Sequence, residues 1–192
     1  MAKFLAMCQP PPDAEMLDLG GYPYHWGETG IRNPVLCANI DVPSGMEQYA
    51  PQFKMVKADA TRLDFPDRRF EVVYSNSVIE HLGTWDKQKD FAREARRVGR
   101  RLWIQTPARC FPIEPHLIAP LVHYLPISIQ RHLLRYGTIW GWITRPSRAQ
   151  VDAFLAEVRL LTFREMAVLF PDCRILRERC CGFTKSYIAV RV

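Results

Sequence analysis

The chain has 192 residues, of which 48% are hydrophobic and 24% are charged, and its formal net charge is +6. These values are typical of one globular domain with enough apolar residues for a core, so no disulfide is needed to stabilise it. The positive charge suits an anionic partner such as nucleic acid, an acidic lipid surface or a phosphorylated substrate. It is equally typical of a protein that simply avoids zero net charge.

The six cysteines do not form a metal-binding pattern, because none has Cys-x-x-Cys spacing and no His pair completes a zinc site. We therefore expect no metal and a reduced, cytoplasmic protein. The apolar run in Met1 to Gln9 is too short for a secretory signal or a membrane span.

Short apolar runs that end at Gly, Asp or Pro predict the first strands. Trp85 to Val98 has helical spacing that places Phe91, Ala95 and Val98 on one face. Strands and helices then alternate, which predicts a doubly wound, mostly parallel sheet with helices on both faces, a Rossmann-like α/β fold. The predicted strands in this part of the chain are 16–19, 35–40, 54–57, 70–74 and 101–106.

Residues 107–150 break this alternation with six prolines among large apolar residues, and we interpret them as an inserted lid or substrate segment within a single domain, 1–192. After the insertion, Thr162 and Glu165 form a capping-box pattern before an apolar helix. Two final strands, 173–181 and 186–192, are joined by a connection too short for a parallel crossover, so we expect them to pair antiparallel.

Polar residues and glycines follow the predicted strands, at the edge where open α/β sheets bind ligands. Asp18, Gly20 and Gly21 follow the first strand, and glycines there let backbone N–H groups approach a ligand. Asp41 follows the second strand, where an acidic residue can accept from ribose hydroxyls. Asp59 follows the third strand and can accept from an adenine amine. Together they indicate an adenosine-containing ligand.

Each of these residues also has a structural interpretation. Gly20-Gly21 can be a tight turn, Asp41 a turn former before Pro43, and Asp59 a helix N-cap. The occurrence of all three features at the ends of successive strands favours the ligand-binding interpretation.

The chain resembles the class I S-adenosylmethionine-dependent methyltransferases, in the small-molecule branch called type 11. The resemblance spans residues 16–192, and part of the insertion, from Gln105 to His116, resembles one bacterial subgroup. Four stretches carry the resemblance: Met16 to Gly21, Asn39 to Asp41, Ala58 to Ala60 and Phe70 to Leu82. The stretch from Phe70 to Leu82 is the most specific match.

The resemblance implies S-adenosylmethionine as the cofactor, with its methionine part over Gly20 and Gly21. Asp41 would hold the ribose, and Asp59 with Ala60 would lie at the adenine edge. The remaining implied positions are Ser75 near the sulfonium end, and Asn76 and His81 on the rim towards the substrate.

The glycine turn departs from the family pattern, because the further glycine that usually follows about two positions on is absent and Gly21 is followed by Tyr22 to Trp26. Aromatic rings at Tyr22, Tyr24 and Trp26 would either stabilise a sulfonium cation or fill the core face of the first helix. We favour the core for Trp26 and include Tyr22 among the cofactor-binding candidates.

Methyl transfer needs an aligned nucleophile and, for a hydroxyl or protonated amine, a general base. Histidine titrates near neutrality, so His81 is the first candidate for a catalytic residue and His116 the second, before Glu80 and Glu114. A helix-end histidine that only complements the helix dipole is the alternative for His81.

The acceptor expected from the sequence is a small molecule, a glycan or a lipid-linked compound. Residues 117–148 combine apolar, aromatic and arginine residues, which suits contact with the inner face of a membrane. The alternative, which we rank first, is that most of them form the core of the insertion. Five arginines between 93 and 101 form a basic patch without interleaved aromatic residues, so we rank nucleic acid lower.

Two further interpretations remain beside a small-molecule enzyme: an RNA methyltransferase, and a degenerate module that binds the cofactor weakly or not at all and serves in interactions without catalysis. A dehydrogenase is disfavoured because Gly-x-Gly-x-x-Gly is absent. The oligomeric state is not indicated by the sequence.

Overall fold

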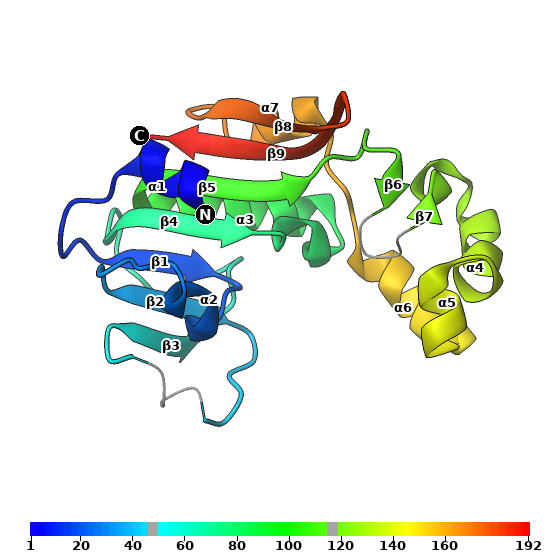
Figure 1. Ribbon diagram of the computed structural model, residues 1–192, viewed down its shortest axis with the longest axis horizontal. Coiled ribbons are helices and arrows are strands. Elements are labelled where there is room, and N and C mark those ends of the chain that lie inside the picture. The colour runs from blue at the N-terminus through cyan, green and yellow to red at the C-terminus, as the bar shows by residue number, and fades with distance from the viewer. Residues whose placement is uncertain (46–49, 115–118) are drawn as a thin grey trace.

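The computed structural model describes residues 1–45, 50–114 and 119–192. A seven-stranded sheet in the order β3-β2-β1-β4-β5-β9-β8 is its central element, shown in Figure 1. The strands are β1 (Met16–Leu19), β2 (Val35–Asn39), β3 (Phe53–Lys57), β4 (Phe70–Asn76), β5 (Gly99–Pro107), β8 (Arg174–Cys180) and β9 (Phe183–Arg191).

The first five strands are parallel, and β9 pairs antiparallel with both β5 and β8. The predicted fold, a mostly parallel sheet with an antiparallel last strand, is confirmed. Strand order reverses between β1, which continues to β2, and β4, which continues to β5. This reversal is the place where open α/β sheets bind ligands.

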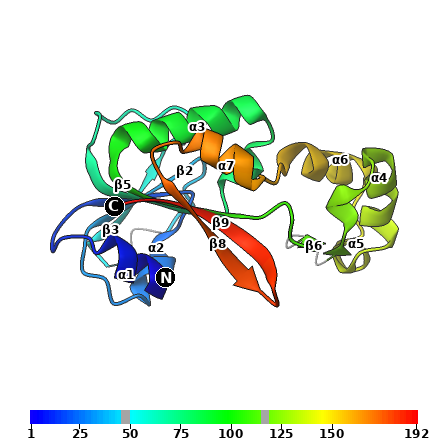
Figure 2. The same cartoon turned by 90° about the horizontal axis from the view of Figure 1, so that it is seen from above.

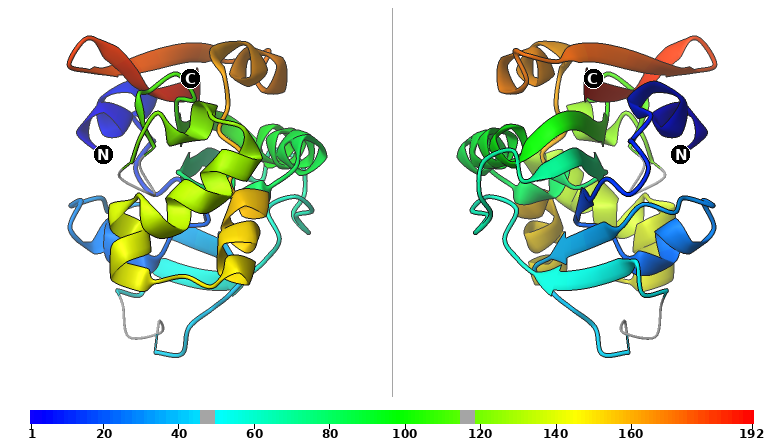
Figure 3. Two further views of the ribbon diagram at one scale, coloured as in Figure 1. Left: turned by 90° about the vertical axis from the view of Figure 1, so that its right-hand side faces the viewer. Right: turned by 90° about the vertical axis from the view of Figure 1, so that its left-hand side faces the viewer.

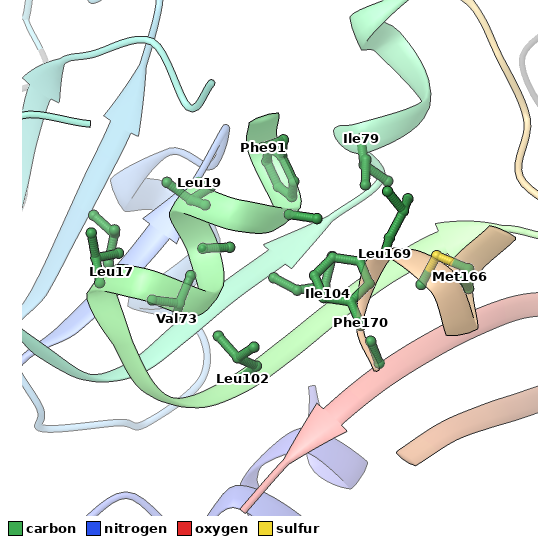
Figure 4. Packing of buried hydrophobic residues seen from close by; sticks show 14 of the residues in the cluster. Leu17, Leu19, Val73, Ile79, Phe91, Leu102, Ile104, Met166, Leu169 and Phe170 are labelled. Atoms are coloured by element: carbon green, nitrogen blue, oxygen red, sulfur yellow. The ribbon is translucent and has the colours of Figure 1, made fainter. Parts of the chain in front are cut away.

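One face of the sheet is covered by α3 (Trp85–Val98) and α7 (Phe163–Leu169), which lie above the sheet in Figure 2. Figure 4 shows the core beneath them, a cluster that includes Phe91 of α3, Phe170 after α7, and Leu102 and Ile104 of β5. Burying an apolar side chain of this size contributes roughly 1.5–3 kcal/mol. The predicted helix at 85–98 is confirmed, as is the capping box of Thr162 and Glu165 at the start of α7.

The opposite face is covered by two short helices, α1 (Ala2–Cys8) and α2 (Pro23–Gly27). Phe4 of α1 packs its ring against those of Trp26, Tyr74 and Trp103, with centroid separations of 6.1, 4.9 and 5.7 Å. The N-terminal residues therefore form a helix that completes the core on this side of the sheet.

The insertion leaves the sheet after β5 and forms a helical unit beyond the carboxyl ends of the parallel strands, at the right of Figure 1. Its elements are β6 (Ile113–Glu114), β7 (Ala119–Pro120), the single-turn helix η3 (Val122–Tyr124), α4 (Ile127–Tyr136), α5 (Ile139–Thr144) and α6 (Arg148–Glu157). The unit therefore extends past residue 150, the predicted end of the insertion. It has a small core of its own around Leu134 and Val151.

The two ends of the insertion lie side by side. Ala108 and Leu161 form a parallel β-bridge, and the N–H of Arg109 donates to the Leu161 carbonyl at 2.9 Å. Among the described residues, no helix has the length and apolar character needed to cross a bilayer.

Candidate cofactor and acceptor sites

A cavity of about 290 Å³ lies at the carboxyl ends of β1 and β4, where the strand order reverses. It is lined by Met1, Asp18, Gly20, Gly21, His25, Trp26, Tyr74 and Asn76. Four of the predicted cofactor-binding residues, Asp18, Gly20, Gly21 and Asn76, are thus brought together.

The glycine turn is shaped by close packing. Gly20 has φ +82°, and a Cβ there would lie 2.5 Å from Cγ2 of Val78. A Cβ on Gly21 would lie only 1.7 Å from Oδ2 of Asp18, so the carboxylate occupies the space that a side chain would take. Both positions require glycine because a Cβ would collide with a neighbouring side chain, and Gly20 requires it also for its positive φ.

Asp18 is buried, and its Oδ2 accepts a hydrogen bond from Nε1 of Trp26 at 2.7 Å. Burial raises the pKa of Asp18 to about 7, against the opposing effect of the Trp26 hydrogen bond. A buried carboxylate in a cavity with aromatic walls is suited to a cation, because a positive charge would stabilise its ionised form. Trp26 belongs to the core, as expected, and it also forms one wall of the cavity.

The other predicted cofactor residues lie outside the lining of this cavity. Ser75 is buried, and its hydroxyl donates to the carbonyl of Leu19 at 2.9 Å, which ties β4 to β1. Tyr22 precedes α2 and stacks on Tyr24, with centroids 5.6 Å apart. Asp41 is exposed in the loop after β2, and Ala60 packs against the core.

Asp59 is exposed and forms a turn. Its Oδ1 accepts from the backbone N–H of Thr61 at 2.8 Å and from the Thr61 hydroxyl at 2.7 Å. The backbone hydrogen bond, followed by the hydroxyl contact, lowers the pKa of Asp59. The suggested helix N-cap role is wrong, because the described residues 58–69 form turns and bends with no helix.

The candidate base His81 lies in η2 (Ile79–Leu82), with Nδ1 3.1 Å from Oε1 of Glu157 in α6. The contact joins the sheet domain to the insertion. The second candidate, His116, lies outside the described residues. Glu80 and Glu114 are both buried, and Glu80 accepts from the Thr106 hydroxyl at 2.9 Å.

A second cavity, of about 260 Å³, lies against the insertion. It is lined by Arg109, Glu114, His123, Ile127, Gln130, Phe154, Leu155, Val158, Arg159 and Leu160. The wall is thus apolar on the α6 side and polar at the residues that follow β5.

His123 is the residue of this cavity that the sequence analysis missed. Its Nε2 donates to the carbonyl of Arg109 at 2.9 Å, which leaves Nδ1 as the unprotonated nitrogen. Nδ1 is buried and has no hydrogen-bond partner in the described structure. Burial lowers the pKa of His123, which favours the neutral ring. No motif marks this position, because His123 acquires its role only when η3 folds against residue 109.

The segment Val78 to Glu80 connects the two cavities. Val78 packs against Gly20 of the first cavity, and the Glu80 carbonyl accepts from the N–H of Arg159, a residue of the second, at 2.7 Å. One short segment therefore contacts both sites.

The chain shares the architecture described above, with reversed strand order and an antiparallel last strand, with the solved structure of a SAM-dependent methyltransferase. Residues 32–101 match the family model described as a methyltransferase domain, of the type 11 group. This match over residues 32–101 bears out the predicted enzyme class, a methyltransferase that uses S-adenosylmethionine as cofactor. No curated protein is similar enough in sequence to count as a match.

Solved structures share this fold at low sequence identity. The 1,6-didemethyltoxoflavin-N1-methyltransferase of Burkholderia thailandensis, solved with its substrate and S-adenosylhomocysteine, has 16% identity and a TM-score of 0.59, covering 98% of this chain and 74% of that one. A SAM-dependent methyltransferase of Aquifex aeolicus has 14% identity and a TM-score of 0.56, covering 100% and 89%. The YcgJ protein of Bacillus subtilis has 14% identity and a TM-score of 0.59, covering 93% and 69%.

Proposed function

We propose that the protein transfers a methyl group from S-adenosylmethionine to a small-molecule, glycan or lipid-linked acceptor. The observation that carries this proposal is the cavity at the Gly20-Gly21 turn, which is lined by the buried Asp18 carboxylate and by the rings of Trp26 and Tyr74. When bound, the cofactor supplies a methyl group already activated by a sulfonium.

The described residues fit the methionine end of this cofactor. Asp18 would offer a carboxylate to its ammonium group, Gly20 and Gly21 would let its backbone-like part approach the turn, and the rings of Trp26 and Tyr74 would suit its cationic charge. Asp41 and Asp59 lie at the neighbouring strand ends, where the resemblance implies the adenosine part. Both side chains are exposed, so we expect the adenosine part of the cofactor to bind near the protein surface rather than in a closed pocket.

We place the acceptor in the second cavity. Its apolar wall suits a hydrophobic body, and Nδ1 of His123 is a buried acceptor that a hydroxyl or amine donor would satisfy. A neutral imidazole beside such a group can take its proton as the methyl bond forms. The contact of Val78 to Glu80 with both cavities supports transfer between them.

Nucleic acid is the weaker candidate for the acceptor. All five arginines of the basic patch are in ion pairs: with Asp90 for Arg93, Asp172 for Arg96, Glu94 and Asp67 for Arg97, and Glu71 for Arg100 and Arg101. Such pairing leaves less net positive charge for a phosphate backbone. The bacterial subgroup and the cytoplasmic location stay predictions.

Calorimetric titration with S-adenosylhomocysteine tests cofactor binding. We expect micromolar affinity for the natural sequence and loss of binding in Gly21→Ala, because the added Cβ collides with the Asp18 carboxylate. Gly27→Ala is the matched control, since a Cβ there meets no atom within 4 Å and the variant should bind normally. Asn76 lines the cavity at the exposed end of β4, so Asn76→Ala removes a lining side chain without a collision. This variant should fold even if Gly21→Ala does not. Absence of binding to the natural protein would favour the degenerate module.

Mass spectrometry of a cell extract incubated with methyl-labelled cofactor tests the transfer. We expect a labelled product with the natural protein and at least tenfold less with His123→Asn, which keeps a polar side chain but has no basic nitrogen to take the proton. His81→Ala in parallel tests the other candidate base. Unchanged labelling by His81→Ala would remove His81 from the mechanism, and unchanged labelling by His123→Asn would remove His123.

A further inference from the structure

The outer side of the insertion carries large apolar side chains that no other part of the described chain covers. We name the set Tyr136, Ile139, Trp142 and Ile143 the interfacial face; their exposed fractions are 57%, 46%, 65% and 77%. Ile139, Trp142 and Ile143 have helical i, i+3, i+4 spacing, so they share one side of α5. Nε1 of Trp142 donates to the Tyr136 carbonyl at 2.6 Å, which joins Tyr136 to this side.

The packing of α5 explains why these side chains point outwards. Gly141 presses on α4, since a Cβ there would lie 2.2 Å from the Leu134 carbonyl oxygen. The side of α5 that meets α4 is thus the glycine side, and the opposite side carries Trp142 and Ile143. Figure 3 shows α4, α5 and α6 forming the end of the molecule that faces away from the sheet.

A basic hollow adjoins the interfacial face. It has a volume of about 370 Å³ and is lined by Ser128, Arg131, His132, Arg135, Tyr136, Arg148 and Val151. Tyr136 belongs to both surfaces, and the guanidinium of Arg135 lies 5.3 Å from the centroid of the Tyr136 ring. Arg131 pairs with Asp152, whereas Arg135 and Arg148 form no ion pair with any described carboxylate. Converging guanidinium groups in a hollow suit a phosphate.

The sequence provides the same charge pattern over a longer segment. Residues 115–151 contain four arginines and no Asp or Glu. Asp152, directly after this segment, pairs with Arg131, and the segment itself provides no acidic side chain to offset the positive charge around the hollow. Apolar side chains beside uncompensated arginines are typical of segments that lie in the headgroup region of anionic membranes.

We infer that this end of the molecule docks on an anionic phospholipid surface, with the interfacial face at the acyl boundary and a lipid phosphate in the basic hollow. The inference goes beyond methyl transfer and does not depend on it. A second copy of the chain is a poorer occupant, because a symmetric contact would bring two sets of like-charged arginines together.

Vesicle flotation tests the inference with the full chain. We expect the protein to float with phosphatidylcholine vesicles that contain phosphatidylglycerol and to stay behind with phosphatidylcholine alone. Added salt should weaken the binding, because the arginine contribution is screened. Absence of flotation with the anionic vesicles at low salt would overturn the inference.

Paired variants separate the two surfaces. Trp142→Ser with Ile143→Ser should lower partitioning at least about tenfold by removing the apolar contact. Arg135→Gln with Arg148→Gln should lower it by about fivefold for each arginine. The matched control is Val168→Ser with Arg164→Glu, which changes an exposed apolar and an exposed basic residue on α7, away from the insertion.

All of these positions are exposed, so the variants should keep the melting temperature of the natural protein. If the control variant lost binding equally, or if the Trp142 and Ile143 variant kept it, the interfacial face would not be the docking surface. Sedimentation velocity without lipid provides the other outcome: a dimer abolished by the same substitutions would assign the face to a second copy. Titration with S-adenosylhomocysteine is unaffected by either result and reports separately on the cofactor site.

Discussion

At the scale of single residues, Asp18 combines a cost to stability with a role in binding. Its carboxyl group is buried beside Trp26 and Tyr74, and burial raises its pKa to about 7 from 3.8. Below pH 4 the group is protonated in both the folded and the unfolded chain. Between pH 4 and 7 only the folded state retains the proton, and this bound proton stabilises the folded state. The free energy of unfolding therefore falls as the pH rises from 4 through 7, where the folded state loses the proton as well.

The first prediction concerns Asp18→Asn. We expect its free energy of unfolding at pH 8 to exceed that of the natural protein by about 2 kcal/mol or more, because a neutral amide does not carry the desolvation penalty. The amide oxygen can still accept from Trp26. Near pH 4 the two proteins should be equally stable. Urea unfolding at both pH values measures this difference.

The same variant should bind S-adenosylhomocysteine at least tenfold more weakly at pH 8, because it offers no charge to the ligand's ammonium group. A gain in stability together with a loss of binding would distinguish a ligand-binding carboxylate from one that only supports the fold. Equal affinity of the two proteins would contradict the assignment of Asp18 to the ligand.

The glycine turn and the strand-end positions could be predicted from sequence because they follow from strand periodicity. The direction in which each side chain points could not be predicted from the sequence. Ser75 turns towards the Leu19 carbonyl, and Asp59 turns back on Thr61, because a nearby backbone group satisfies each of them. The Asp18–Trp26 hydrogen bond depends on how α2 lies beneath β1, which no local pattern records.

At the scale of elements, Arg159 fastens the end of the insertion to the sheet domain. Its guanidinium donates to Oε1 of Gln88 at 2.6 Å and to Glu165, and it lies over the ring of Trp85 at 5.0 Å. Its backbone N–H and carbonyl are bonded to Glu80 and Gln88. One residue thus joins α6 to η2, α3 and α7.

The second prediction concerns Arg159→Met. We expect a loss of about 2 kcal/mol in the free energy of unfolding, because half-buried polar partners lose their donors. Arg164→Met, on the exposed side of α7, should change it by less than about 0.5 kcal/mol. Chemical denaturation measures both. Equal effects of the two substitutions would show that the Arg159 contacts contribute no net stability.

Elements with strict periodicity were predicted closely, as with the strands at 16–19 and 70–74 and the helix at 85–98. The insertion was located but not resolved into helices, because its prolines and apolar residues lack a regular spacing. The short helix α1 was not predicted, since its seven residues are stabilised by packing of Phe4 and Cys8 rather than by helix propensity.

At the scale of the whole molecule, the two faces of the sheet are unequally covered. One face is covered by α7 and the 14-residue helix α3, whereas the other depends on α1 and α2, which have 7 and 5 residues. Phe4 is the main contribution of α1, because it touches aromatic residues from α2, β4 and β5. It also supports Trp26, a wall of the cofactor cavity.

The third prediction concerns Phe4→Ala. We expect a loss of about 3–4 kcal/mol in the free energy of unfolding, as for other buried aromatic residues. Trp26 should become less well held, so affinity for S-adenosylhomocysteine should fall as well. Lys3→Ala, on the exposed side of the same helix, should leave both unchanged. Thermal melting and calorimetry provide the two measurements.

The bridge between Ala108 and Leu161 has a consequence for how such proteins diversify. The chain leaves the sheet domain and returns to it at adjacent points. The contacts between these two points therefore offset the entropic cost of closing the loop, whatever the inserted segment itself contributes. A short linker could span the same points. The sheet domain can therefore accept different inserted segments at this point, and one segment can replace another without a change in the glycine turn at Gly20-Gly21.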